Sequence, residues 1–181
     1  MVVLGGGPGG YAAAFLAADE GLDVTIVEAE PRIGGTCLLR GCIPSKALLH
    51  VAKVIHEVDQ LREDWGVTYS KRPKIDIDKV RERKDKVIST LTTGLAGLAK
   101  RRGVKVIQAR GKFVDSTTLS LEGSHESIPA EGKLTVDRCG LATGSVPAMP
   151  PGVDLGTDRV MDSTGALERA ARPQSLVVGG G

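Results

Sequence analysis

The sequence is poor in the residues that mark several classes of protein. Aromatic residues make up only 3% of its 181 residues, so a hydrophobic core has to be built from Val, Leu, Ile and Ala. No apolar run approaches the ~20 residues that cross a bilayer, and no charged leader precedes an apolar stretch. The net charge of +2 is too small to indicate nucleic acid binding. We therefore expect a cytoplasmic protein with no membrane and no nucleic acid partner.

Cysteine and histidine are also scarce, with three of each. So few cysteines exclude a structural disulfide framework, and a close pair of thiols in such a chain is more often catalytic or metal-binding. A zinc site needs about four ligands, and His50 and His56 do not complete one with the cysteine pair, so no metal site is predicted. Cys139 stands alone in a strand-like stretch and is interpreted as a small core residue.

The chain is organised around residues 34–46, which read GGTCLLRGCIPSK. Cys37 and Cys42 lie five positions apart, which is a rise of about 7.5 Å on an ideal helix. A disulfide requires Cα atoms within roughly 7 Å, so a bridge between the two needs a broken helix start, which Gly41 and Pro44 permit. Strained, accessible bridges are the reducible ones. We interpret the pair as a working redox disulfide.

The amino-terminal glycines have the context of a dinucleotide-binding fingerprint. A strand at 2–4 precedes the pattern Gly5-x-Gly7-x-x-Gly10, a helix at 11–20 follows it, and a second strand at 24–27 runs into Glu28. Gly5 permits the tight turn, Gly7 the approach of a pyrophosphate, and Gly10 the packing of helix on strand. Glu28 is placed to accept hydrogen bonds from ribose. The alternative, a glycine-rich turn in a plain α/β fold, does not explain the position of this acid.

The middle of the chain predicts further helices and a small sheet. Apolar residues recur at helical spacing over 48–58, and a long helix is expected from Asp76 or Asp78 to about Arg102. Its expected buried stripe is Val80, Val87, Ile88, Leu91, Leu95 and Leu98. The excess of basic residues over 71–112 is interpreted as a solvated helix face rather than a site for an acidic partner. A strand is expected at 104–109, and residues 111–136 predict an antiparallel meander that residues 140–145 close.

The end of the chain repeats its beginning, because residues 176–181 read LVVGGG where residues 2–7 read VVLGGG. The fold class predicted is α/β, with a Rossmann-like domain over 1–148 that includes the meander, a linker over 149–174 containing a helix near 164–171, and the first strand and glycine loop of a second such unit over 175–181. We therefore expect a fragment of a longer enzyme that binds its cofactor poorly and is inactive alone.

Residues 34–37 and 42–46 closely resemble the active-site motif of the pyridine nucleotide–disulfide oxidoreductases. Residues 43–50 and 162–167 favour, within this family, the members that oxidise protein-bound dihydrolipoamide. Members that reduce glutathione disulfide or mercuric ion are the alternatives, and a non-catalytic FAD-binding or scaffold module is the alternative from another functional class. The commoner Asn-Val of this motif is replaced here by Leu39-Arg40, and the cation of Arg40 is expected to lower a thiol pKa.

The resemblance implies roles for individual residues. Cys37 matches the thiol that exchanges with the sulfur of dihydrolipoamide, Cys42 the thiol that faces the flavin, and Lys46 the lysine that lies against the isoalloxazine ring. The other positions implied in FAD binding are Gly5, Gly7, Pro8, Gly10, Glu28, Gly35, Thr36, Gly111, Ala142, Thr143, Gly144 and Ser145.

The resemblance also implies cofactors and partners. FAD would bind this region and NAD the region beyond it. The partners implied are lipoyl domains and the core of a 2-oxoacid dehydrogenase complex, with a homodimer as the full-length state. The family's catalytic base is a His paired with a Glu in a carboxyl-terminal domain, contributed by the other subunit, and none of the three His residues here matches it.

Overall fold

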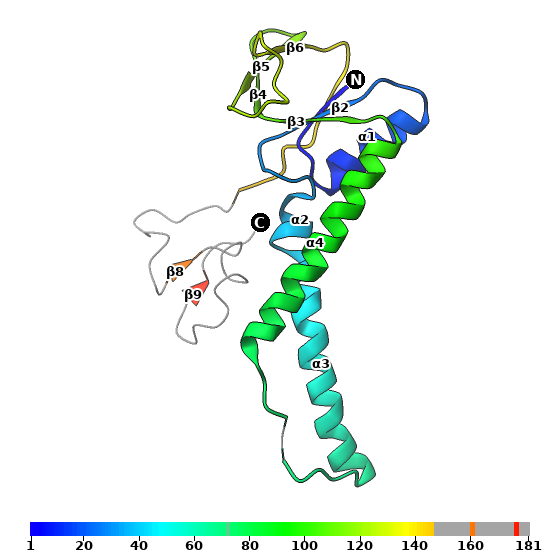
Figure 1. Cartoon of the computed structure of the whole chain (residues 1–181), viewed down its shortest axis with the longest axis vertical. Helices are drawn as coiled ribbons and strands as arrows, with labels where there is room; N and C mark the ends of the chain where they lie inside the picture. The colour runs from blue at the N-terminus through cyan, green and yellow to red at the C-terminus, as the bar shows by residue number, and fades with distance from the viewer. Residues whose placement is uncertain (72, 147–159, 162–175, 178–181) are drawn as a thin grey trace.

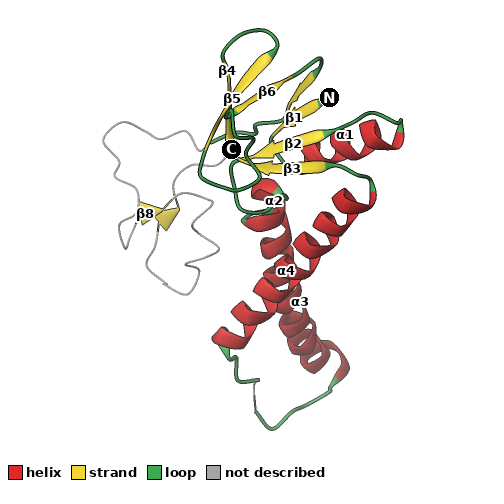
Figure 2. Cartoon of the chain, turned by 45° about the horizontal axis from the view of Figure 1, so that its top comes forward, coloured by secondary structure: helices red, strands yellow, loops and turns green. Residues whose placement is uncertain are grey.

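The structure is a computed structural model that describes residues 1–71, 73–146, 160–161 and 176–177. Its centre is a parallel sheet of β1 (Val2–Leu4), β2 (Thr25–Glu28), β3 (Lys105–Gln108) and β7 (Cys139–Leu141), in the order β3-β2-β1-β7. Short runs of Val and Ile suit this arrangement, because parallel strands are covered on both faces and leave little room for polar side chains. Figure 2 shows β1, β2 and β3 side by side.

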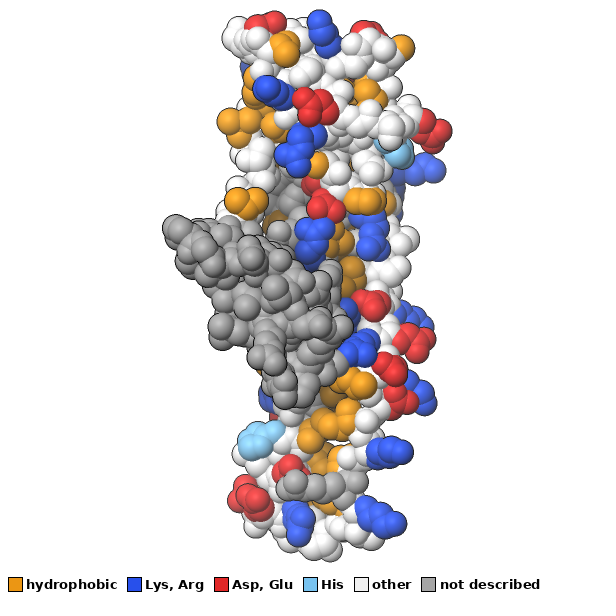
Figure 3. Space-filling model, turned by 90° about the vertical axis from the view of Figure 1, so that its left-hand side faces the viewer, with side chains coloured by type: hydrophobic (Ala, Val, Ile, Leu, Met, Phe, Trp, Pro, Cys, Tyr) orange, Lys and Arg blue, Asp and Glu red, His pale blue; other side chains and the backbone are white. Residues whose placement is uncertain are grey.

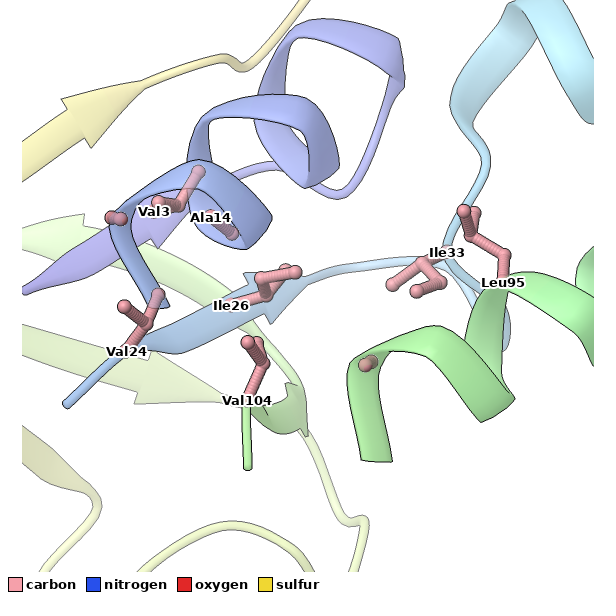
Figure 4. Close-up of a cluster of buried hydrophobic side chains, with 9 residues drawn as sticks. Val3, Ala14, Val24, Ile26, Ile33, Leu95 and Val104 are labelled. Carbon is pink, nitrogen blue, oxygen red and sulfur yellow. The ribbon is translucent and has the colours of Figure 1, made fainter. Parts of the chain in front are cut away.

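Two helices, α1 (Pro8–Asp19) and α4 (Ile77–Arg101), cover one face of this sheet. Small residues of α1 let the helix lie close to the strands, so that Ala14 is completely buried between α1 and the sheet. Figure 4 shows the cluster that results, which contains Val3, Ala14, Ala17, Val24, Ile26, Ile33, Leu95, Ala99 and Val104. The helix α4 therefore reaches the core through its last turns.

A three-stranded antiparallel sheet covers the opposite face. It consists of β4 (Arg110–Phe113), β5 (Thr118–Glu122) and β6 (Lys133–Thr135), in that order, which confirms the predicted meander. Neighbouring residues of a strand point to opposite faces, and accordingly Val2 and Val27 pack here while Val3 and Ile26 pack against the helices. The second cluster contains Val2, Val27, Ile107, Ala109, Leu119, Leu121 and Val136.

The segment after the meander behaves differently from the prediction. Residues 139–141 form β7, which pairs in parallel with β1, so the segment returns to the central sheet and does not close the meander. The free edge of β1 supplies the backbone partners for this return. Cys139 lies half-buried beside the second cluster, close to its predicted place in the core, and burial raises the pKa of its thiol.

Between β2 and β3 the chain forms α2 (Gly35–Leu39), then α3 (Cys42–Trp65), and finally α4. Figure 1 shows α3 and α4 side by side as a long arm that projects from the sheet. Asp76 caps α4 by accepting a hydrogen bond from the backbone N–H of Lys79 at 3.2 Å, as predicted. Gly66, with φ 69°, ends α3. Within the described residues no helix is both long and apolar enough to cross a membrane.

The predicted buried stripe of α4 is confirmed at Ile88 and Leu95 but is wrong at Leu91, which lies between them. Ile88 and Leu95 are buried, whereas Leu91 is 42% exposed and Thr92 takes the core-facing position of that turn. The helix turns this face toward the core only near its carboxyl end, because its amino-terminal half contacts α3 and α2 beyond the sheet. Apolar side chains flanked by charged ones follow the lower part of this arm in Figure 3.

Two basic residues near the beginning of α4, Arg81 and Lys84, form ion pairs. A cavity of about 540 Å³ between the loop after β2, α2 and α4 is lined by Arg32, Arg81 and Lys84 among others. Arg81 pairs with Asp78 and Lys84 with Asp85, each at 2.9 Å, so neighbouring carboxylates offset much of the positive charge. Lys84 departs from the predicted solvated face, because its side chain is only 11% exposed and lines this cavity.

The end of the chain adds one further pair of strands, in which β8 (Val160–Met161) lies parallel to β9 (Leu176–Val177). The strand β8 falls within the range predicted as a linker, and β9 within the predicted second unit. The predicted helix at 164–171 and the glycine loop at 179–181 lie outside the described residues.

Candidate functional site

The candidate site residues gather at the carboxyl edge of the parallel sheet. Gly5 follows β1, Glu28 ends β2, and Ala142 follows β7. In open α/β sheets this is the edge where ligands bind, because the loops that leave adjacent strands meet there. The tertiary structure thus brings three distant segments of the chain to one place.

The first glycine loop packs backbone against backbone. Gly5 has φ 101°, which favours glycine, and its N–H donates to the carbonyl of Val27 at 2.8 Å. A Cβ on Gly5 would strike the carbonyl of Ala142, and a Cβ on Gly10 would strike the carbonyl of Gly5. Each of these glycines is therefore needed for the close approach of the loop, α1 and the end of β7.

The beginning of α1 faces the beginning of α2. Gly7 precedes α1, and Pro8 is the first residue of the helix. Proline has no N–H, but an N–H at the first position of a helix has no partner within the helix, so no hydrogen bond is lost. Gly35 has φ 60°, and a Cβ on it would lie 2.6 Å from the Cα of Gly7. The unpaired N–H groups at the start of α1 and this bare backbone surface form a cradle suited to a phosphate group.

The Glu28 carboxylate joins two loops. Its Oε2 accepts a hydrogen bond from the N–H of Gly6 at 2.7 Å, and its Oε1 accepts one from the N–H of Glu30 at 2.9 Å. The carboxylate is therefore held at the carboxyl ends of β1 and β2, in the place where the fingerprint puts the ribose-binding acid.

Sequence reasoning missed two glycines of this cradle. Gly34, with φ 140°, donates its N–H to the carbonyl of Gly6 at 2.7 Å, and a Cβ on Gly6 would meet Ile33 and the carboxylate of Glu28. Both residues stand in runs of consecutive glycines, which were the signal available for them. Of these runs, only the fingerprint positions and Gly35 were predicted to bind the cofactor.

The remaining predicted positions lie around this cradle. Gly111, in β4, packs against Leu4 so closely that a Cβ would meet its side chain at 2.5 Å. The N–H of Ala142 donates to the carbonyl of Leu4 at 2.8 Å. The exposed residues that follow lead away from the Gly5 turn, and they are Thr143, Gly144 and Ser145. Thr36 is exposed on the first turn of α2.

The two cysteines lie on either side of a break between helices. Cys37 belongs to α2, Arg40 and Gly41 interrupt the helical backbone, and Cys42 begins α3. The predicted broken helix is thus confirmed. Both residues are free thiols in this structure, with Cys37 half-buried and Cys42 exposed. The two side chains are nonetheless close enough to interact, since Cys42 has the largest effect on the pKa of Cys37.

Several groups act on the thiol of Cys37. The hydrogen bond to Cys42 raises the pKa of Cys37 above its ordinary value, and burial raises it further. The backbone N–H of Cys42 and the ammonium of Lys46 act in the opposite direction, because both stabilise the thiolate. Lys46 is therefore the side-chain cation that favours the reactive form.

For Cys37, the expectation that Arg40 lowers a thiol pKa is wrong. The net shift of the Cys37 pKa is upward, and Arg40 is not among the groups that set it. The guanidinium of Arg40 is directed to the loop after β2, where it pairs with the carboxylate of Glu30 at 2.8 Å.

Replacing Lys46 with methionine is expected to slow alkylation of Cys37 by iodoacetamide about threefold at a pH below the thiol pKa. Loss of the ammonium raises the pKa further, so the pH profile of the alkylation rate moves to higher pH. Peptide mass spectrometry gives the rate at Cys37. Lys53→Met is the matched control, because Lys53 lies farther along α3 beside Glu57. An unchanged or downward-shifted profile for the Lys46 variant would contradict this role.

Three similar proteins from different organisms share the name dihydrolipoyl dehydrogenase. The chain is 49% identical to a dihydrolipoyl dehydrogenase of Vibrio cholerae, over all of its own length and 37% of that protein. It is 45% identical to a dihydrolipoyl dehydrogenase of Haemophilus influenzae, with the same coverage. A mitochondrial dihydrolipoyl dehydrogenase of Pisum sativum is 40% identical over 98% of this chain and 35% of that protein. The chain thus spans little more than a third of the length of these relatives.

A solved structure supports the same assignment. The flavoprotein disulfide reductase RclA from Escherichia coli, described as a Cu(II) complex, superimposes with a TM-score of 0.65 at 25% identity. The match covers 92% of this chain and 33% of that one. A family model described as pyridine nucleotide-disulphide oxidoreductase matches residues 1–181. With its glycine cradle at the sheet edge and its two thiols across a helix break, the chain belongs to the pyridine nucleotide–disulphide oxidoreductase family.

Proposed function

We propose that this chain provides the FAD-binding region and the redox-active cysteines of a dihydrolipoyl dehydrogenase. The observation that carries the proposal is the placement of Cys37 and Cys42 on either side of the break between α2 and α3, where α2 begins against the glycine loop. The names of the relatives across bacteria and plants supply the substrate class.

The residues at the sheet edge fit FAD. A Cβ on Gly5, Gly10 or Gly35 would strike neighbouring backbone, so these glycines let the loop pack closely and present the start of α1, whose N–H groups suit a pyrophosphate. Glu28 lies at the end of β2, within reach of a ribose bound in this cradle. When bound, FAD supplies a centre that accepts an electron pair from thiols and passes it to a nicotinamide.

The exchange proposed at the cysteines is a balanced transfer of two electrons. In the oxidised protein, a thiolate of dihydrolipoamide attacks the Cys37 sulfur, the Cys37–Cys42 bond breaks, and Cys42 leaves as a thiolate. The second substrate thiol then attacks the substrate sulfur of the mixed disulfide, which releases oxidised lipoamide and leaves Cys37 and Cys42 reduced. The two protons of the substrate thiols balance the two cysteine thiols that the exchange produces.

The whole protein's partners follow from the same proposal. NAD+ is the proposed final acceptor, lipoyl domains of a 2-oxoacid dehydrogenase complex are the proposed source of dihydrolipoamide, and the cytoplasm is the proposed location. These belong to the full-length enzyme, together with a homodimeric state.

A chimeric enzyme tests the proposal. Residues 1–181 replace the matching amino-terminal segment of the Vibrio cholerae dihydrolipoyl dehydrogenase, and NADH formation from dihydrolipoamide and NAD+ is measured. We expect activity within about tenfold of the parent enzyme, because the glycine loop, Glu28 and the cysteine motif of this chain match the pattern of the family. The same exchange with the segment of the Haemophilus influenzae relative is the positive control.

The outcomes of this experiment separate the alternatives. A folded, yellow chimera that fails with dihydrolipoamide but reduces glutathione disulfide or mercuric ion with NADH would point to another member of the family. A folded chimera that binds no flavin, while the control chimera does, would contradict the proposed FAD site itself.

A further inference from the structure

The helix α2 is tied to the nucleotide loops at both of its ends. At its beginning, the N–H of Gly34 donates to the carbonyl of Gly6 at 2.7 Å. At its end, Arg40 pairs with the carboxylate of Glu30 at 2.8 Å. Because Cys37 lies between these two attachments, its place is determined by both.

The attachment through Glu30 continues to the first glycine loop. The N–H of Glu30 donates to Oε1 of Glu28 at 2.9 Å, and Oε2 of the same carboxylate accepts from Gly6 at 2.7 Å. A series of contacts thus runs from the turn after β1, through the turn after β2, to Arg40. Arg40 lies between the two cysteines in sequence, next to the Gly41 at which the helix breaks.

We propose that the Glu30–Arg40 ion pair is a positioning pair that holds the turn between the two cysteines in the geometry that lets Cys37 and Cys42 form a bond. The inference rests on the proposed redox role of these cysteines. The two side chains are 42% and 34% exposed, so water screens the pair only partly. The pair can restrain Arg40 and Gly41, whose backbone angles depart from those of a helix.

A positioning role of the ion pair and an effect of its charges predict different results when Glu30 or Arg40 is replaced. If the pair holds the turn, loss of either side chain loosens the same contact, so loss of Glu30 adds nothing once Arg40 is absent. If the pair acts through charge, loss of Arg40 removes a cation and loss of Glu30 removes an anion, so the two variants shift the thiols in opposite directions.

The test measures the equilibrium between the dithiol and the disulfide in this chain, without flavin or lipoamide. Mixtures of reduced and oxidised dithiothreitol set the potential. As the Cys37–Cys42 bond forms, the disulfide of oxidised dithiothreitol breaks and takes up two electrons and two protons. Alkylation of the remaining thiols and mass spectrometry give the bridged fraction. Glu30→Gln is expected to lower the equilibrium constant for bridge formation about threefold, and Arg40→Gln to lower it at least as much.

The double variant and a charge exchange complete the cycle. Glu30→Gln with Arg40→Gln is expected to show the same loss as Arg40→Gln alone, and Glu30→Arg with Arg40→Glu to recover part of it. The matched control is Asp19→Asn with Arg102→Gln, which breaks a comparably exposed pair at 2.9 Å that joins α1 to the end of α4. Circular dichroism establishes that each variant is folded.

The results that overturn the inference are distinct. Opposite shifts in the two single variants, a double variant in which the losses multiply to about ninefold, unchanged constants, or an equal shift in the Asp19/Arg102 control would each overturn it. If the wild-type chain forms no Cys37–Cys42 bridge at any ratio of dithiothreitol, the proposed function fails as well. A bridge in the wild type with unchanged variants overturns only the positioning role.

Discussion

Replacing Cys37 with serine in the chimeric enzyme is expected to reduce NADH formation from dihydrolipoamide by roughly a thousandfold or more. A hydroxyl at this position cannot form the mixed disulfide through which the substrate thiol exchanges electrons, and no neighbouring thiol takes its place. Cys42 lies across the helix break on α3, but without Cys37 it has no partner for an internal bond. Steady-state NADH absorbance at saturating dihydrolipoamide measures the loss.

The third cysteine provides the matched control for this variant. Cys139 lies in β7, half-buried beside the second hydrophobic cluster, and Cys139→Ser is expected to keep at least about half of the activity, with a small loss of stability from the buried hydroxyl. Cys42→Ser is expected to be as inactive as the Cys37 variant and to lose the long-wavelength absorbance that a thiolate beside a flavin produces. Normal turnover by Cys37→Ser would show that the assignment of the exchanging thiol is wrong.

Replacing Gly10 with alanine is expected to lower the free energy of unfolding of this chain by about 3 kcal/mol and to abolish FAD binding by the chimera. The added Cβ would strike the backbone carbonyl of Gly5, so α1 has to move away from β1 and from Ala142. That movement opens the turn on which the phosphate cradle depends. Urea unfolding followed by circular dichroism measures the stability, and flavin fluorescence after gel filtration measures retained FAD.

The neighbouring residue Gly9 is the control, because a Cβ placed on it meets no atom within 4 Å. Gly9→Ala is expected to leave FAD binding intact and to change the free energy of unfolding by no more than about 1 kcal/mol, in the stabilising direction, since alanine favours the helix over glycine. If the two alanine variants unfold at the same urea concentration, the close packing of Gly10 against Gly5 does not contribute as argued.

Local features of the sequence were sufficient for much of the fold. Asp76 is an N-cap whose partner lies three residues away, and the meander alternates within short segments, so both are decided by near neighbours. The break between Cys37 and Cys42 was predictable for the same reason, because Gly41 and Pro44 disfavour a continuous helix locally. The strand, glycine turn and helix at the amino terminus likewise form a unit of contiguous residues.

Features that depend on distant residues were not predictable in this way. The return of β7 to the edge of β1 joins residues far apart in sequence, and the exposure of Leu91 depends on where α4 leaves the sheet. Arg40 forms an ion pair with the carboxylate of Glu30, and this pairing depends on how the loop after β2 lies beside α2. A charge acts according to its distance from the thiol, which position in sequence does not report.

The sequence by itself determined the chemical groups of this protein: a cysteine pair at a helix break, a glycine loop between a strand and a helix, and an acid at the end of the next strand. Only the tertiary structure decided how they meet, because parallel strands bring separate loops to one edge of the sheet. There Gly5 touches Ala142, Gly7 touches Gly35, and Glu28 and Glu30 connect the glycine loop to the turn between the thiols.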